Sequence, residues 1–124
     1  MPAPSELAIA TKAVERLTKE ERYYQSELVR QQERVQKLEE EIKKGGADLD
    51  PNAEFILRQE KQAADETVAI FTPLKERTEA AVTKLEEQLA MSESSGSAAD
   101  DELTAAREAL KKGQQAVQKD KEES

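Results

Sequence analysis

Carboxylates are the most abundant side chains in this sequence that could do acid–base chemistry. The 124 residues include 27 Asp and Glu but no Cys and no His, which excludes a thiol nucleophile, a disulfide, a thiolate zinc site and a catalytic imidazole. The runs at 39–41 and 86–87 place glutamates next to each other in sequence. Adjacent helical residues do not face each other, however, and no nucleophile or phosphate-binding loop accompanies these runs. The sequence therefore predicts no enzymatic activity, no cofactor and no bound metal.

Basic and aromatic side chains near the N-terminus are better suited to binding a partner. A set that begins at Ile9 recurs every seven residues, a spacing that keeps its members on one side of a helix. Arg and Tyr are enriched at protein–protein interfaces. The alternative is an ordinary solvated helix surface with Glu–Arg pairs. We use the name basic lane for the polar members of this set and two lysines on an adjacent line: Lys12, Arg16, Lys19, Tyr23, Arg30 and Lys37.

A long amphipathic helix over about 5–44 must position the basic lane. Its apolar residues follow a 3-4 spacing in one heptad register, which is typical of a coiled-coil seam. Lys43 and Lys44 suit the C-terminal end of a helix, and Gly45-Gly46 ends it. The seam consists of Leu7, Ala10, Val14, Leu17, Tyr24, Leu28, Val35, Leu38 and Ile42.

Two polar residues, Glu21 and Gln31, interrupt this seam. One explanation is that the helix tilts and leaves them at its edge, or that they pair with polar side chains across the helical hairpin. The other is that they fix the register and discourage open-ended coiled-coil association. The candidates for the pairing are Glu60, Thr67 and Lys75.

Two further helices are predicted. The second, over about 50–89, has Asp50 as a capping residue and Pro51 in its first turn. We expect Pro73 to kink or break it near 70–72. A flexible Ser/Gly-rich link over 92–99 follows. The third helix, over about 100–118, repeats the 3-4 spacing at Leu103, Ala106, Leu110, Gly113 and Val117.

These lengths predict an all-α fold with a single domain over 1–124. It is a three-helix bundle in which a long antiparallel helical hairpin packs with a shorter third helix in a left-handed, coiled-coil-like manner. We expect the third helix to lie beside the C-terminal half of the second, where Val82 and Leu89 would contact it. The third-helix residues at that contact are Leu103, Leu110 and Val117.

The other end of the hairpin, near Gly45-Gly46, would then stay two-stranded. Apolar side chains of the second helix would lack a covering helix there, and exposed apolar patches mark sites of association. A partner protein or a second copy of the chain could cover them. We use the name apolar flank for these residues: Phe55, Ile56, Ala63 and Ile70.

Charge and hydropathy limit the class of protein further. The net charge is −8, and residues 5–44 carry nine bases and nine acids, so the excess of acid lies in the remainder. Such a surface disfavours binding to nucleic acid. The N-terminus lacks the features of a signal peptide, and no apolar run approaches the ~18 residues that a membrane span needs. We therefore expect a soluble intracellular protein.

The first helix resembles a known family. The run from Lys12 to Tyr24, KAVERLTKEERYY, continues through Glu27-Leu28 to Gln31-Gln32-Glu33 and is similar to the opening of tubulin-binding cofactor A. The similarity extends over the whole chain, through Pro73, the segment 85–89 and a short third helix around 105–109. The first helix is its specific part.

The resemblance implies a three-helix bundle that serves as a small folding cofactor without covalent chemistry. Such proteins capture quasi-native β-tubulin after its release from the cytosolic chaperonin and hold it for assembly of the α/β-tubulin heterodimer. The implied partners are β-tubulin and other tubulin-folding cofactors, the implied state is a monomer or weak homodimer, and the implied location is the cytoplasm and cytoskeleton. Because tubulin is acidic, the basic lane is one expected contact surface. The exposed apolar flank is the other. The alternative is a generic coiled-coil adaptor or oligomerisation module.

Overall fold

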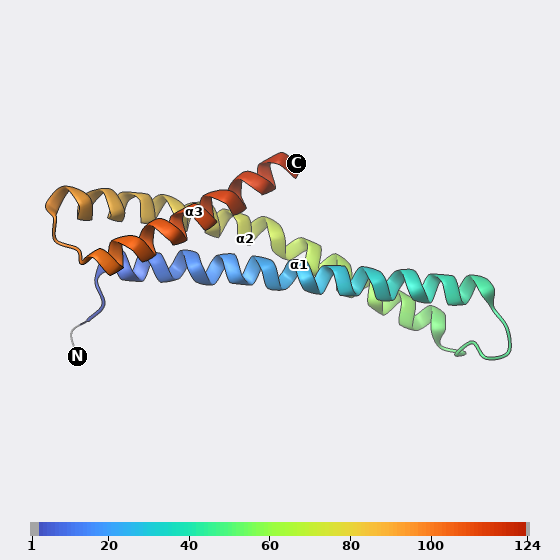
Figure 1. The fold of residues 1–124 in the computed structure, drawn as a ribbon. Coiled ribbons are helices and arrows are strands. Elements are labelled where there is room, and N and C mark those ends of the chain that lie inside the picture. The colour runs from blue at the N-terminus through green and yellow to red at the C-terminus, as the bar shows by residue number, and fades with distance from the viewer. Residues whose placement is uncertain (1–2, 124) are drawn as a thin grey trace. The chain divides into compact units, whose positions relative to one another are not determined.

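The computed structural model describes residues 3–123, with side chains for 3–119, and over that range it consists of three helices and no strand (Figure 1). Helix α1 is Glu6–Lys44, α2 is Ala53–Ser95 and α3 is Asp100–Glu123. The predicted all-α, three-helix class is confirmed.

The chain divides into two compact units, which are described separately. The three-helix unit comprises the chain up to Glu21 and the chain from Thr72 onward, and it contains the first part of α1, the second part of α2 and all of α3. The hairpin unit is Arg22–Phe71, which contains the rest of α1, the first part of α2 and the loop between them.

The three-helix unit has a closed apolar core. The 3-4 spacing turns one stripe of each helix inward, and the third helix covers the groove between the other two. The predicted contact of Val82 and Leu89 with α3 is confirmed, because Leu103, Leu110 and Val117 pack against the cluster that contains them. The buried cluster consists of Leu7, Ala10, Val14, Val82, Leu85, Leu89, Ala106 and Ala109.

The hairpin unit has only two helices and a much thinner core. Ion pairs cross it from Arg34 Nε to Glu60 Oε2 at 3.2 Å and from Lys61 Nζ to Glu39 Oε2 at 3.3 Å. Ala53 is the one apolar residue of this unit that is fully buried. Two helices can enclose a narrow seam but cannot cover its flanks. Further apolar residues of the hairpin unit therefore stay half-buried, among them Tyr24, Leu28, Val35, Leu38, Ile42 and Leu57.

The start of α2 differs from the prediction. The helix begins at Ala53 rather than near Asp50, because Asp50 heads a separate turn through Pro51. Its Oδ1 accepts a hydrogen bond from the Asn52 N–H at 2.8 Å, and its carbonyl accepts one from the Ala53 N–H at 3.0 Å. The loop before this turn uses two glycines with positive φ, Gly45 at 64° and Gly46 at 107°, where L side chains are strained.

The ends of α2 and α3 also lie further along the chain than predicted. α2 continues to Ser95, so the link to α3 is 96–99 and the predicted flexible link over 92–99 is wrong in its first four residues. The extra turn carries Glu93, whose Oε2 accepts a hydrogen bond from Arg107 Nη2 of α3 at 3.0 Å. Gly96, at φ 66°, then ends the helix by donating its N–H to the Ser92 carbonyl at 3.0 Å. α3 runs to Glu123 rather than to about 118.

Pro73 does not interrupt α2. The helix is continuous from Ala53 to Ser95, so the predicted break near 70–72 is wrong, while a kink stays a prediction. Pro73 and Ala69, four residues before it, are both exposed. An exposed position lets water bond the Ala69 carbonyl in place of its lost helical donor, which lowers the cost of the missing hydrogen bond.

Candidate partner-binding surfaces

The part of the basic lane that belongs to the three-helix unit consists of free cations. Lys12, Arg16 and Lys19 are exposed, because the 3-4 spacing of the seam residues on either side turns the other face of α1 into the core. None of the three forms an ion pair with a described residue. Their charges are available to an acidic partner without breaking an existing contact.

The part of the basic lane in the hairpin unit is also exposed. Tyr23 is 59% exposed and makes an edge-to-face contact with Tyr24, with ring centroids 5.2 Å apart. Arg30 Nη2 donates to Glu27 Oε2 at 2.8 Å, and this hydrogen bond and the charge of Glu27 raise the pKa of Arg30. Lys37 forms no ion pair with a described residue. Within this part of the basic lane, the side chains of Tyr23 and Lys37 are therefore more available to a partner than that of Arg30.

The apolar flank is only partly covered within the hairpin unit. Phe55 is 53% exposed, and the Arg58 guanidinium carbon lies 6.0 Å from the centroid of its ring, a weak cation–π contact. Ile56, Ala63 and Ile70 are half-buried. Phe55 is therefore the residue of this flank that offers the most apolar surface to a partner.

The two polar seam residues are buried. Glu21 and Gln31 are each 7% exposed, so the explanation that places them at the edge is wrong. Of the three candidates for pairing with them, Glu60 pairs with Arg34, and Thr67 Oγ1 donates to the Ala63 carbonyl at 3.1 Å. The third, Lys75, forms no ion pair with a described residue. Gln31 Oε1 is buried without a hydrogen-bond partner. The role of these residues in fixing register stays a prediction.

Two glutamates of the runs at 39–41 and 86–87 make surface contacts. Glu39 pairs with Lys61, and Glu86 Oε2 accepts a hydrogen bond from Gln114 Nε2 at 3.2 Å. Over the described range, no group of three or more carboxylates is arranged to hold a metal ion. None of the three helices, as far as they are described, is long and apolar enough to cross a membrane.

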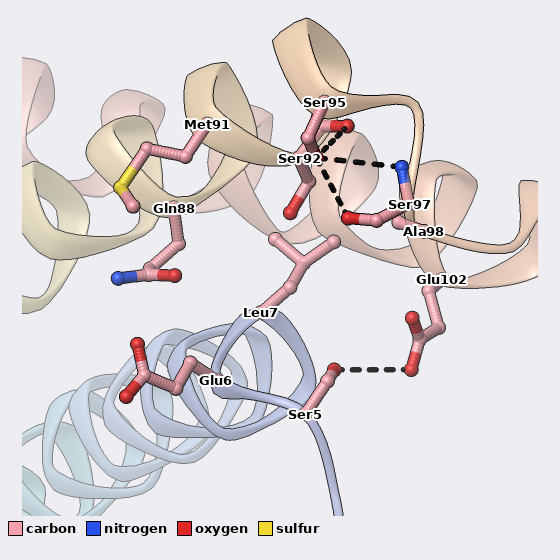
Figure 2. Close-up of a pocket in the computed structure, with 10 residues that line it drawn as sticks. All are labelled: Ser5, Glu6, Leu7, Gln88, Met91, Ser92, Ser95, Ser97, Ala98 and Glu102. Atoms are coloured by element: carbon pink, nitrogen blue, oxygen red, sulfur yellow. Dashed lines mark hydrogen bonds between the residues drawn. The ribbon is translucent and has the colours of Figure 1, made fainter.

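Sequence reasoning missed a pocket of about 300 Å³ in the three-helix unit. It lies where α1 begins, α2 ends and α3 begins (Figure 2). The serine-rich segment that looked like a flexible link supplies much of its wall, so composition gave no signal for it. The lining residues come from the residue before α1, from all three helices and from the 96–99 link: Ser5, Glu6, Leu7, Gln88, Met91, Ser92, Ser95, Ser97, Ala98 and Glu102.

Comparisons with known proteins give the family of the chain. The model of the family described as tubulin binding cofactor A matches residues 2–110, which is most of the chain. Over 75 residues the chain is 39% identical to tubulin-specific chaperone A of Saccharomyces cerevisiae, a match that covers 60% of this chain and 63% of that relative. No solved structure matches the chain significantly. The chain belongs to the tubulin binding cofactor A family.

Proposed function

We propose that this protein is a tubulin-folding cofactor. In this role it captures quasi-native β-tubulin after release from the chaperonin and holds it, through exposed helical surfaces, for assembly of the α/β-tubulin heterodimer. The name of the yeast relative, a tubulin-specific chaperone, supports the choice of client. The protein does no covalent chemistry in this role and works in the cytoplasm, with other tubulin-folding cofactors as further partners.

One observation carries the assignment of the contact surface. Lys12, Arg16 and Lys19 are exposed and unpaired within the described chain, although the protein as a whole has a charge of −8. A local concentration of free cations lets an acidic protein bind an acidic client and steers their encounter. Tyr23, Arg30 and Lys37 extend the set along α1.

Phe55 and its neighbours in the apolar flank would supply the desolvated part of the interface. Aromatic side chains dominate the binding free energy of many interfaces. Phe55 is already exposed before any client binds. Because most of the contact surface is polar and solvent-exposed, we expect moderate affinity and reversible binding. Both properties suit a protein that must release its client.

The test is a size-exclusion binding assay with chaperonin-released β-tubulin, α-tubulin and the intact heterodimer. We expect a complex with β-tubulin alone, and we expect Arg16→Glu with Tyr23→Ala to weaken it by about tenfold or more. Lys111→Glu is the matched control, because Lys111 is an exposed cation on α3 outside the basic lane. Binding that the double variant leaves unchanged would exclude the basic lane as the interface.

An oligomerisation module is the second candidate, favoured by the half-buried seam of the hairpin unit. Sedimentation at micromolar concentration distinguishes the two functions. A stable trimer or tetramer would favour the oligomerisation module, whereas a monomer or weak dimer agrees with the cofactor.

A further inference from the structure

Two exposed cations of α2 lie on the side of the α1–α2 pair that faces away from α3. Val14 of α1 and Val82 of α2 both point toward α3, because a Cβ on Gly113 would stand 2.8 Å from the first and 2.7 Å from the second. A helix turns by about 100° per residue, so residues two or five positions from such a valine point about 140–160° away from it. On α2 these positions include Arg77 and Lys84, both exposed.

The same offsets place the first part of the basic lane on this side. Counting from Val14, the residues two or five positions away are Ile9 and the first three cations of the basic lane. Met91 follows Val82 by nine residues, which is about two and a half turns, and therefore also points away from α3. Ile9 is 55% and Met91 61% exposed. We use the name outer face for the side chains at these positions: Ile9, Lys12, Arg16, Lys19, Arg77, Lys84 and Met91.

The outer face is strongly basic, although the chain has a net charge of −8. None of its cations forms an ion pair with a described residue. Among the described residues of the three-helix unit, Glu87 is the one carboxylate at a matching offset, five positions after Val82. An ordinary solvated surface mixes charges of both signs, whereas an uncompensated group of cations attracts an acidic partner.

The two exposed apolar side chains mark one end of the outer face. Met91 lines a pocket together with Leu7, at the start of α1 (Figure 2), and Ile9 lies two residues further along α1. A phosphate polymer would pair with the cations but leave this apolar end uncovered. An anionic membrane would repel the rest of the acidic chain, and two apolar side chains give little insertion. A protein segment with carboxylates and an apolar residue complements both parts of the outer face.

The spacing of the cations favours a helix over an extended segment. Lys12, Arg16 and Lys19 span about 10.5 Å along α1, at about 1.5 Å per residue. A partner helix presents carboxylates at i, i+4 and i+7 over the same length. An extended strand places side chains of one face about 6.6 Å apart, so it offers only two over that length. The α1–α2 pair already accepts a helix on its opposite side, where α3 completes the buried cluster.

We propose that the outer face binds an acidic amphipathic helix of the client. An apolar side chain of that helix lies on Ile9 and Met91, while its carboxylates pair with the basic lane on one side and with Arg77 and Lys84 on the other. The inference rests on the proposed function, because the client supplies the helix. It adds α2 to a contact surface that the basic lane alone confined to α1.

The experiment is an NMR titration of the ¹⁵N-labelled full chain with a capped, alanine-based helical peptide that carries a leucine and three glutamates on one face. The matched control peptide has the same composition, with its glutamates distributed around the helix. We expect saturable shifts of the backbone amides of Ile9, Arg16 and Lys84, and about tenfold weaker binding of the control peptide. Added salt should weaken the binding, because the paired charges are near the surface.

Variants test the part of the outer face that lies on α2. Arg77→Gln with Lys84→Gln should weaken binding of the peptide by about threefold to tenfold, and it should weaken the β-tubulin complex as well. Lys111→Gln with Lys112→Gln removes the same charge from exposed positions of α3 and should change neither. A thermal melt establishes that both variants are folded.

The failure of this proposal and the failure of the proposed function give different results. Equal binding of the two peptides, or equally tight binding of an oligonucleotide or of anionic vesicles, would overturn the assignment of a helix. A β-tubulin complex that Arg77→Gln with Lys84→Gln leaves unchanged would remove α2 from the contact surface, while the proposed function stands. Absence of any β-tubulin complex, with peptide binding intact, would refute the proposed client and retain the outer face as a site for an acidic helix.

Discussion

Gly113 of α3 lies so close to Val82 of α2 that a Cβ on the glycine would stand 2.7 Å from Val82 Cγ2. The same Cβ would stand 2.8 Å from Val14 Cγ1 of α1. Glycine at this position therefore allows α3 to approach both other helices of the three-helix unit. Both valines are buried, so neither side chain can move aside into solvent.

Gly113→Ala should destabilise the protein although alanine is the better helix former. Helix propensity favours alanine by about 1 kcal/mol, whereas overpacking a closed core costs roughly 1–3 kcal/mol. We expect a lower midpoint in urea denaturation. The exposed substitution Lys112→Ala serves as the control, and Val82→Ala should recover part of the loss when it is combined with Gly113→Ala. A Gly113→Ala variant more stable than the parent would contradict the close approach.

Gln31→Leu should stabilise the hairpin unit. The buried Oε1 of Gln31 has no hydrogen-bond partner, and an unsatisfied buried polar group costs about 1–3 kcal/mol. Urea denaturation should therefore show a gain of about 1 kcal/mol, compared with no gain for Gln32→Leu, since Gln32 is exposed. Sedimentation of the same variant tests the register hypothesis, because loss of the polar seam residue should then increase self-association.

Lys12→Gln with Lys19→Gln should slow the association with β-tubulin more than it speeds dissociation. Exposed charges at the rim of an interface act mainly on the encounter rate, and these two cations have no ion pair to lose within the described chain. We expect an on-rate about threefold to tenfold lower at low salt, with a smaller difference at physiological salt. Lys111→Gln with Lys112→Gln is the control, and an equal effect from that pair would mean that only net charge matters.

Phe55→Ala should weaken client binding without weakening the fold. The side chain is 53% exposed, so the free energy of unfolding should change by no more than about 0.5 kcal/mol, while loss of an aromatic contact should lower affinity by about tenfold. Leu74→Ala is the contrasting variant, because Leu74 is buried in the core. It should lower the free energy of unfolding by roughly 2–5 kcal/mol. Unchanged affinity in Phe55→Ala would remove the apolar flank from the proposed interface.

Local sequence signals predicted most of the helical architecture. The 3-4 spacing identified α1 and which of its side chains are exposed, because a helix of fixed period puts residues three and four apart on one face. Gly45-Gly46 ended α1 where expected, because glycine readily takes the positive φ that the turn needs. The exposure of Lys12, Arg16 and Lys19 followed from the same periodicity.

Predictions from composition were wrong at the end of α2 and at Pro73, where contacts with distant residues or with solvent determine the structure. The serines after Leu89 are typical of a flexible link, yet α2 continues to Ser95 and Glu93 pairs with Arg107 of α3. Pro73 suggested a break, yet an exposed position lets water satisfy the freed carbonyl.

Local spacing and charge were enough to predict the number of helices, their apolar faces and the exposed positions of the basic lane, because a helix of known period places each residue on a definite side. Packing in three dimensions sets which polar residues are buried and how closely α3 approaches at Gly113, and it brings the ends of three helices together around a pocket. These features depend on which residues, far apart in the chain, pack against one another, and the period of a single helix does not specify that.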